Sequence, residues 1–162
     1  MRKKILITLA VVLVIIQFIH PEKNKAPGRQ ANALATLITV PDNIKNIFAK
    51  ACNDCHSNNT RYPWYSHIQP QHWWMNNHVR EGKRELNFDE YANRPLRYQY
   101  HKMEEIADEV EEGEMPLDSY TWMHRDARLT ETEKKEVVDW ANSVRANMES
   151  KYPRDSLIRK KQ

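Results

Sequence analysis

Glycine and cysteine are both scarce in this chain of 162 residues, which has three glycines and two cysteines. So little glycine argues against a turn-rich all-β architecture and against the glycine-rich loops that bind phosphate groups. No nucleophile elbow or other catalytic pattern stands out, so the sequence does not predict an enzyme. The chain is 40% hydrophobic and 29% charged, which is typical of a globular protein, and helices become the expected secondary structure.

The middle of the chain has more acidic than basic residues. Residues 41–148 hold 14 Lys and Arg against 19 Asp and Glu, whereas residues 1–40 hold 6 against 1 and residues 149–162 hold 5 against 2. A nucleic-acid-binding protein would carry its basic patch on the folded body, so no nucleic-acid partner is predicted. We interpret the basic ends as solvated or close to a negatively charged membrane surface.

The N-terminus has the pattern of an export signal or membrane anchor, because Arg2-Lys3-Lys4 precedes an apolar run from Ile5 to Ile19. As a helix this run would be about 22 Å long, short of a hydrocarbon core about 30 Å thick, so a cleaved signal peptide fits its length. The candidate cleavage sites between Ala31 and Ala35 lie well beyond the run, which favours an uncleaved transmembrane helix. No cysteine closely follows the run, which argues against a lipoprotein anchor. We therefore expect a protein tethered on the periplasmic side of the bacterial inner membrane, or a soluble periplasmic one after cleavage.

Apolar residues recur at helical spacing through the body of the chain, so the fold is expected to be mainly α. The predicted divisions are an anchor or signal peptide over 1–20, a linker over 21–40, a helical domain over 41–148 and a basic tail over 149–162. Inside the domain, helices are expected from Asp42, over 71–83, over 101–112 with Gly113 as its stop, and from the capping box Thr130-Glu131-Thr132-Glu133.

Both cysteines lie in the motif Cys52-Asn53-Asp54-Cys55-His56, at the end of the first of these helices. A disulfide between them would close a tiny loop and remove little unfolded-chain entropy. A thioredoxin-like dithiol would need a βαβ context, which is missing. A structural zinc site would need four ligands, and only His67, His72 or His78 could add to the motif because there is no second cysteine pair.

C-x-x-C-H is also the attachment signal for c-type haem. Two thiols about one helical turn apart reach the two vinyl groups of the porphyrin, and the adjacent histidine then meets the iron. Covalent attachment follows export, in agreement with the N-terminus. The sequence therefore predicts one covalent haem c held by Cys52 and Cys55, with His56 as the proximal iron ligand, in a cytochrome c-like helical domain.

Met115 is the predicted sixth ligand of the iron, because it lies in a loop beside Pro116 and a thioether ligand raises the reduction potential. Met75, His78, Met123 and His124 remain as alternatives. Aromatic and basic residues just after the motif are candidates to wall the ring or to donate to its propionates, namely Arg61, Tyr62 and Trp64.

Three blocks of the sequence resemble the small haem-binding domain proteins of bacteria, which are exported or membrane-tethered. The blocks are CNDCHSNNTRYPWYSHIQPQHWW, NHVREGKRELNFDEY and EEGEMPLDSYTWMHRDARLTETE, and the resemblance covers roughly residues 44–145. It implies a monohaem c-type domain with His56 as proximal ligand.

Two functions follow as hypotheses. The first is electron transfer to or from redox protein partners, with both axial positions of the iron filled. The second is a haem-based sensor or small-ligand-binding module with an open distal site.

Overall fold

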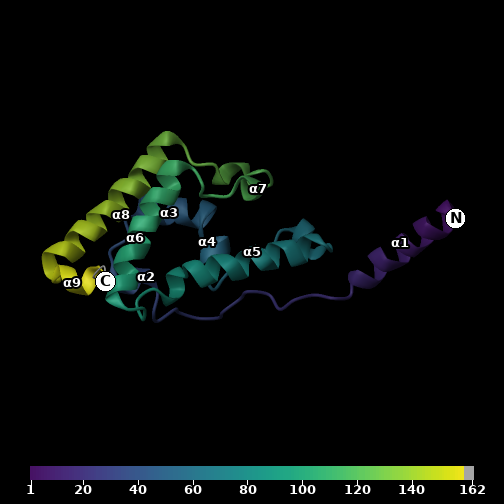
Figure 1. The fold of residues 1–162 in the computed structure, drawn as a ribbon, viewed down its shortest axis with the longest axis horizontal. Helices are drawn as coiled ribbons and strands as arrows, with labels where there is room; N and C mark the ends of the chain where they lie inside the picture. The colour runs from purple at the N-terminus through teal and green to yellow at the C-terminus, as the bar shows by residue number, and fades with distance from the viewer. Residues whose placement is uncertain (159–162) are drawn as a thin grey trace.

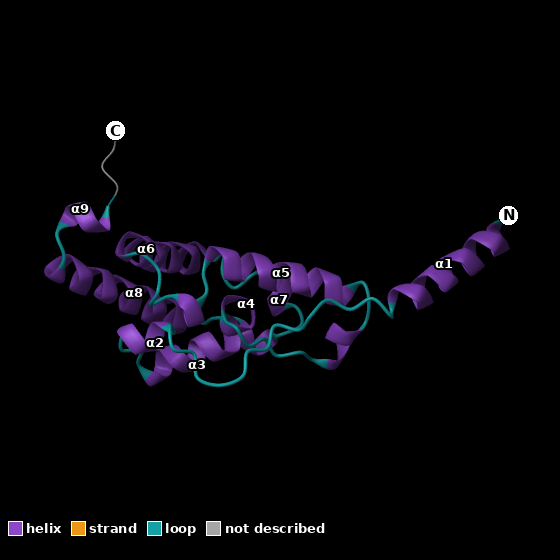
Figure 2. Ribbon diagram, turned by 90° about the horizontal axis from the view of Figure 1, so that it is seen from below, coloured by secondary structure: helices purple, strands orange, loops and turns teal. Residues whose placement is uncertain are grey.

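The computed structural model describes residues 1–158, and over that range the protein is mainly α, as predicted, with nine α-helices and no strand (Figures 1 and 2). The helices are α1 (Arg2–Ile16), α2 (Leu34–Leu37), α3 (Asp42–Ala51), α4 (Asn53–His56), α5 (Gln71–Glu85), α6 (Leu96–Glu112), α7 (Asp118–Thr121), α8 (Glu131–Lys151) and α9 (Arg154–Leu157). Three 3₁₀ turns join them, η1 (Trp64–His67), η2 (Phe88–Glu90) and η3 (Arg125–Ala127).

The core forms where α6 and α8 lie side by side and α3 packs across them (Figure 1). Phe48 of α3 stacks on Phe88 with ring centroids 4.7 Å apart and meets Trp140 of α8 edge-on at 5.4 Å. Each of these helices buries one stripe of residues at helical spacing, namely Ile44, Ile47, Phe48 and Ala51 on α3, Met103, Ile106, Ala107 and Val110 on α6, and Val137, Trp140, Ala141, Val144 and Met148 on α8.

Local signals set the ends of the two longest core helices. The predicted capping box is present at α8, where the Glu133 amide donates to the Thr130 hydroxyl and the Thr130 amide donates back to the Glu133 carboxylate. Gly113 ends α6 with a φ of 79°, a left-handed conformation that glycine adopts without strain. Helix α6 begins at Leu96 rather than at residue 101, because Pro95 precedes its first turn and Tyr100 is buried in the core.

Helix α1 stands apart from the rest of the molecule in both views, and none of its residues is buried (Figures 1 and 2). It ends at Ile16 after 15 residues, which is about 22 Å of helix. The predicted N-terminal helix is therefore present. Among the described residues, however, no helix is both long and apolar enough to cross a membrane, so the predicted transmembrane helix is not found.

The two segments predicted as linker and tail contribute to the folded body. In residues 21–40, Leu34 and Val40 are buried in the core, and the Asn24 amide side chain donates to the hydroxyl of Thr60 at 2.9 Å. At the other end, α9 places Leu157 in the same core, 2% exposed. Both segments carry isolated apolar residues whose partners are distant in sequence, so periodicity did not predict their packing.

The junction between α1 and the body is built on the start of α5. Gln17 and Gln69 exchange two hydrogen bonds, and the indole of Trp73 donates to the carbonyl of Ile19 at 3.0 Å. Next to them lies His72, which is 1% exposed and meets the ring of His20 edge-on at 5.4 Å. Neither ring nitrogen of His72 has a hydrogen-bond partner within the described part of the chain.

His72 is expected to make the protein less stable in mild acid. Burial, followed by the nearby His20, His67 and Lys23, lowers the pKa of His72 in the folded protein. The unfolded chain then binds this proton more readily, so the free energy of unfolding falls as the pH drops below about 6.5, the ordinary histidine value. Urea denaturation at about pH 7.5 and about pH 5.5 measures this fall in the free energy of unfolding. The fall should be smaller in His72→Phe than in the wild type. An equal loss in both proteins would contradict this assignment.

Candidate functional site

A cavity of about 500 Å³ lies between α3, α4, α5, α6 and the chain around α7. This volume is within the usual range of small-molecule and cofactor sites. Its walls are largely apolar, with Phe48, Val79 and Ile106 among them. They also include the two predicted attachment cysteines, Cys52 and Cys55, and the two predicted iron ligands, His56 and Met115. A larger cleft of about 1150 Å³ between α6, α8 and α9 contains none of the predicted haem-binding residues.

The two cysteines reach the cavity because α3 continues almost directly into the single turn of α4. Cys52 separates the two helices: its amide donates to the Phe48 carbonyl, and its carbonyl accepts from the His56 amide at 3.0 Å. Both cysteines are free thiols and half-buried. Burial raises the pKa of Cys52 to about 12 and that of Cys55 to about 11, so both are protonated at neutral pH.

The His56 ring is held in one tautomer. Its Nδ1 lies 3.0 Å from the carbonyl oxygen of Leu86, and since a carbonyl can only accept, Nδ1 carries the hydrogen. Burial lowers the pKa of His56, which favours the neutral ring. An imidazole whose Nδ1–H is bound to a backbone carbonyl presents an unprotonated Nε2, the usual arrangement of a metal-binding histidine. The motif therefore fits an iron ligand at this position.

Gly82 brings α5 into direct contact with the motif. A Cβ atom added at this residue would lie 2.9 Å from the Cys55 carbonyl oxygen and 3.1 Å from the Cys55 Cβ. Only a residue without a side chain allows the two helices to approach so closely. The sequence analysis did not identify Gly82, although a glycine inside a helical segment of a glycine-poor chain was an available signal.

Met115 reaches the cavity through the turn that follows α6. Gly113 reverses the chain, the Met115 amide donates to the Glu109 carbonyl at 3.0 Å, and the half-buried side chain packs against the core. Three of the four alternative ligands also line the cavity, namely Met75, His78 and His124. Met123 does not line it and is 56% exposed.

The structure brings only one of the three candidate ring contacts to the cavity. Arg61 lines it, but the Arg61 guanidinium is engaged by Asp54, with Nε 3.2 Å from each carboxylate oxygen. Tyr62 turns toward the N-terminal segment, where its hydroxyl accepts from the Asn24 amide at 2.7 Å. Trp64 is 75% exposed. Neither aromatic residue lines the cavity.

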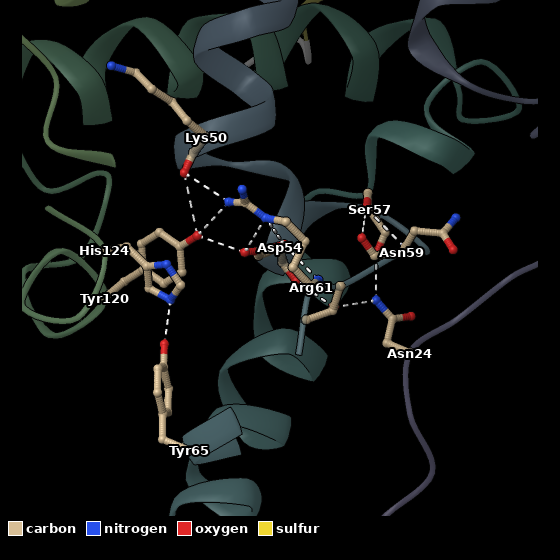
Figure 3. A network of polar contacts seen from close by, with 10 residues as sticks. Asn24, Lys50, Asp54, Ser57, Asn59, Arg61, Tyr65, Tyr120 and His124 are labelled. Atoms are coloured by element: carbon tan, nitrogen blue, oxygen red, sulfur yellow. Dashed lines mark hydrogen bonds and ion pairs between the residues drawn. The ribbon is translucent and has the colours of Figure 1, made fainter. Parts of the chain in front are cut away.

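Asp54, between the two cysteines, is the centre of a polar network that the sequence analysis missed (Figure 3). Its buried carboxylate accepts from the Arg61 amide and from the hydroxyl of Tyr120, each at 2.8 Å. The Tyr120 ring stacks on His124, and His124 Nε2 lies 2.6 Å from the Tyr65 hydroxyl. A carboxylate inside the motif with an arginine seven positions later was the available signal.

Lys102 was also missed. It lies on α6 and lines the cavity, although only 8% of the residue is exposed, and its ammonium group is paired with Glu105. The pairing is needed because an isolated ammonium group is costly to bury. On the sequence it stands among acidic residues, which concealed its place on the buried face of the helix.

Comparison with known proteins agrees with this site. A family model described as a haem-binding domain matches residues 11–143, which include the motif, α5 and the Met115 loop. Neither a curated relative nor a solved structure matches the chain. Because the match spans most of the sequence, the chain belongs to the haem-binding domain family.

Proposed function

We propose that the protein is a monohaem c-type cytochrome-like electron carrier with the haem in the 500 Å³ cavity. Cys52 and Cys55 would hold the haem through thioether bonds, and His56 Nε2 would bind the iron. One observation supports this most strongly: both thiols and a histidine with its Nδ1–H occupied by Leu86 line the same largely apolar cavity. The family match independently supports haem as the ligand.

Met115 is proposed as the sixth ligand, which makes electron transfer the preferred function. It shares the cavity with His56, and a thioether favours the reduced iron and raises the potential. The rival imidazoles are engaged elsewhere: His124 is bonded to Tyr65, and the His78 ring lies 4.2 Å from that of Trp74. Met115 has no such competing polar partner because a thioether is only a weak acceptor.

Export to the periplasmic side of the inner membrane, with redox proteins as partners, is part of the same proposal. Covalent haem is attached after export, and α1 has three basic residues, Arg2-Lys3-Lys4, followed by a largely apolar stretch. That helix exposes its apolar residues all around, so it is available to a membrane or an export machinery.

Absorption spectra of the haem-loaded protein test the sixth ligand. The oxidised wild type should show the sulfur-to-iron charge-transfer band, and the reduced form should bind carbon monoxide poorly. Met115→Ala should lose the band, bind carbon monoxide readily and lower the potential by on the order of 0.1 V, a modest part of the ~0.8 V span that axial ligands control.

Met75→Ala is the matched control, since this methionine also lines the cavity, and it should keep the band and the potential. If the wild type lacks the band and binds carbon monoxide readily, electron transfer with Met115 ligation is wrong. The sensor or small-ligand-binding function then becomes the better description of the same haem site.

A further inference from the structure

We propose that Asp54 is a positioning residue that holds the Met115 loop, residues 113–124, closed over the haem cavity. This inference rests on the proposed function, because it concerns the sixth ligand of the same haem. In the structure one carboxylate inside the C-x-x-C-H motif is bound directly to the segment that carries Met115 (Figure 3).

Asp54 is buried, 6% exposed, so its carboxylate needs partners in the protein. Arg61 supplies two of them, the backbone amide at 2.8 Å and the Nε at 3.2 Å. The hydroxyl of Tyr120 supplies the third at 2.8 Å. Burial and the neighbouring Asp54 carboxylate raise the pKa of Tyr120, so this hydroxyl remains a hydrogen-bond donor.

Tyr120 is connected to Met115 by a short stretch of hydrogen-bonded backbone. The amides of Tyr120 and Thr121 donate to the carbonyl of Leu117, at 2.9 and 3.1 Å, which fixes α7 to the residues that follow Met115. Leu117 and Met115 both line the cavity. A displacement of Tyr120 away from Asp54 would therefore move the cavity wall that includes Met115.

A second contact at the same end of the loop strengthens the hold on Tyr120. His124 stacks flat on the Tyr120 ring, with centroids 4.2 Å apart and planes 13° apart, and is itself bonded to the Tyr65 hydroxyl. Arg61 adds a bridge, since its terminal nitrogen lies 3.3 Å from both the Tyr120 hydroxyl and the Lys50 carbonyl. Residues 113–124 therefore contact the motif through polar side chains, and single substitutions can remove these one by one.

Two variants of the haem-loaded full chain test the proposal. Asp54→Asn keeps the shape but removes the negative charge, which weakens the hydrogen bonds that position 54 makes with Arg61 and Tyr120. Tyr120→Phe removes the hydroxyl alone and tests the same bond if Asp54→Asn fails to fold. Both should retain covalent haem in a denaturing gel, weaken the sulfur-to-iron band, and speed carbon monoxide binding about tenfold, since a hydrogen bond to a charged group holds the loop closed.

The double variant should bind carbon monoxide no faster than the faster single variant, because both changes break one link. Tyr100→Phe is the control, since Tyr100 also donates to a carboxylate, that of Glu149, but lies in the cleft away from the motif. It should leave the band and carbon monoxide binding unchanged.

The possible failures are distinguishable. A wild type without covalent haem or without the sulfur-to-iron band overturns the proposed function and this inference together. A wild type with both, whose Asp54→Asn and Tyr120→Phe variants match it in band intensity and carbon monoxide kinetics, overturns the positioning role alone. Tyr100→Phe also loses a hydrogen bond to a carboxylate, so it controls for a general loss of stability. A lower unfolding midpoint with an unchanged spectrum in this variant would show that lost stability alone does not alter the band.

Discussion

Replacing Cys52 and Cys55 by alanine is expected to remove all covalently bound haem. In a strain with a cytochrome c maturation system, the wild type should keep its haem stain after denaturing electrophoresis, and the double variant should show none. The reason is that the described residues hold no thiol other than these two, and both line the cavity beside His56. Each single variant should keep a reduced signal through the remaining thiol.

Asn53→Ala is the matched control for this experiment. Asn53 lies between the two cysteines on α4, and the change leaves both thiols and the Asp54 contacts in place. Its haem stain should equal that of the wild type. An undiminished stain in the double cysteine variant would show that the haem is attached elsewhere, whereas bound zinc without haem in the wild type would contradict the haem assignment itself.

Gly82→Ala is expected to destabilise the protein and to reduce haem loading, against the usual effect of this substitution in a helix. Helix propensity alone favours alanine over glycine by about 1 kcal/mol. Here the added Cβ would lie 2.9 Å from the Cys55 backbone oxygen, so α5 must move away from the motif. Forcing a methyl group into such a contact costs about 1–3 kcal/mol, so the net change in the free energy of unfolding should be unfavourable.

Position 80 provides the matched comparison, because Arg80 is exposed on the same helix. Urea denaturation should find Arg80→Ala more stable than Arg80→Gly by about 1 kcal/mol. At position 82 the order of alanine and glycine should reverse. Alanine that stabilises both positions equally would mean that α5 does not press on Cys55 as the structure indicates.

Much of the local structure could be predicted because its causes are close together in the sequence. The stripe from Ile44 to Ala51, the Thr130 capping box and the Gly113 stop each depend on residues within about two turns of one another. The C-x-x-C-H spacing is local in the same sense. The expectation of a mainly α fold with a haem-binding motif therefore needed no knowledge of the packing.

The start of α6 and the packing of residues 21–40 were harder to predict, for a common reason. Leu34, Val40 and Tyr100 are buried by partners far away in the chain, so their neighbours in sequence give no periodic signal. Within the site, Arg61 is the residue whose partner the sequence did not predict. Its position after the motif suggested a propionate donor, but in the fold the nearer carboxylate of Asp54 takes the guanidinium.

The sequence by itself determined the apolar stripes of the main helices, the α8 capping box and the C-x-x-C-H spacing, because these depend on hydrogen bonds and spacings between near neighbours. Only the tertiary structure decided which side chains share the cavity. It left Tyr62 and Trp64 outside the cavity lining, pressed Gly82 against Cys55 and joined Asp54 to Tyr120, which is 66 positions away in the chain. Contacts at such separations exist only once helices pack, since packing rather than local spacing sets the distance between them.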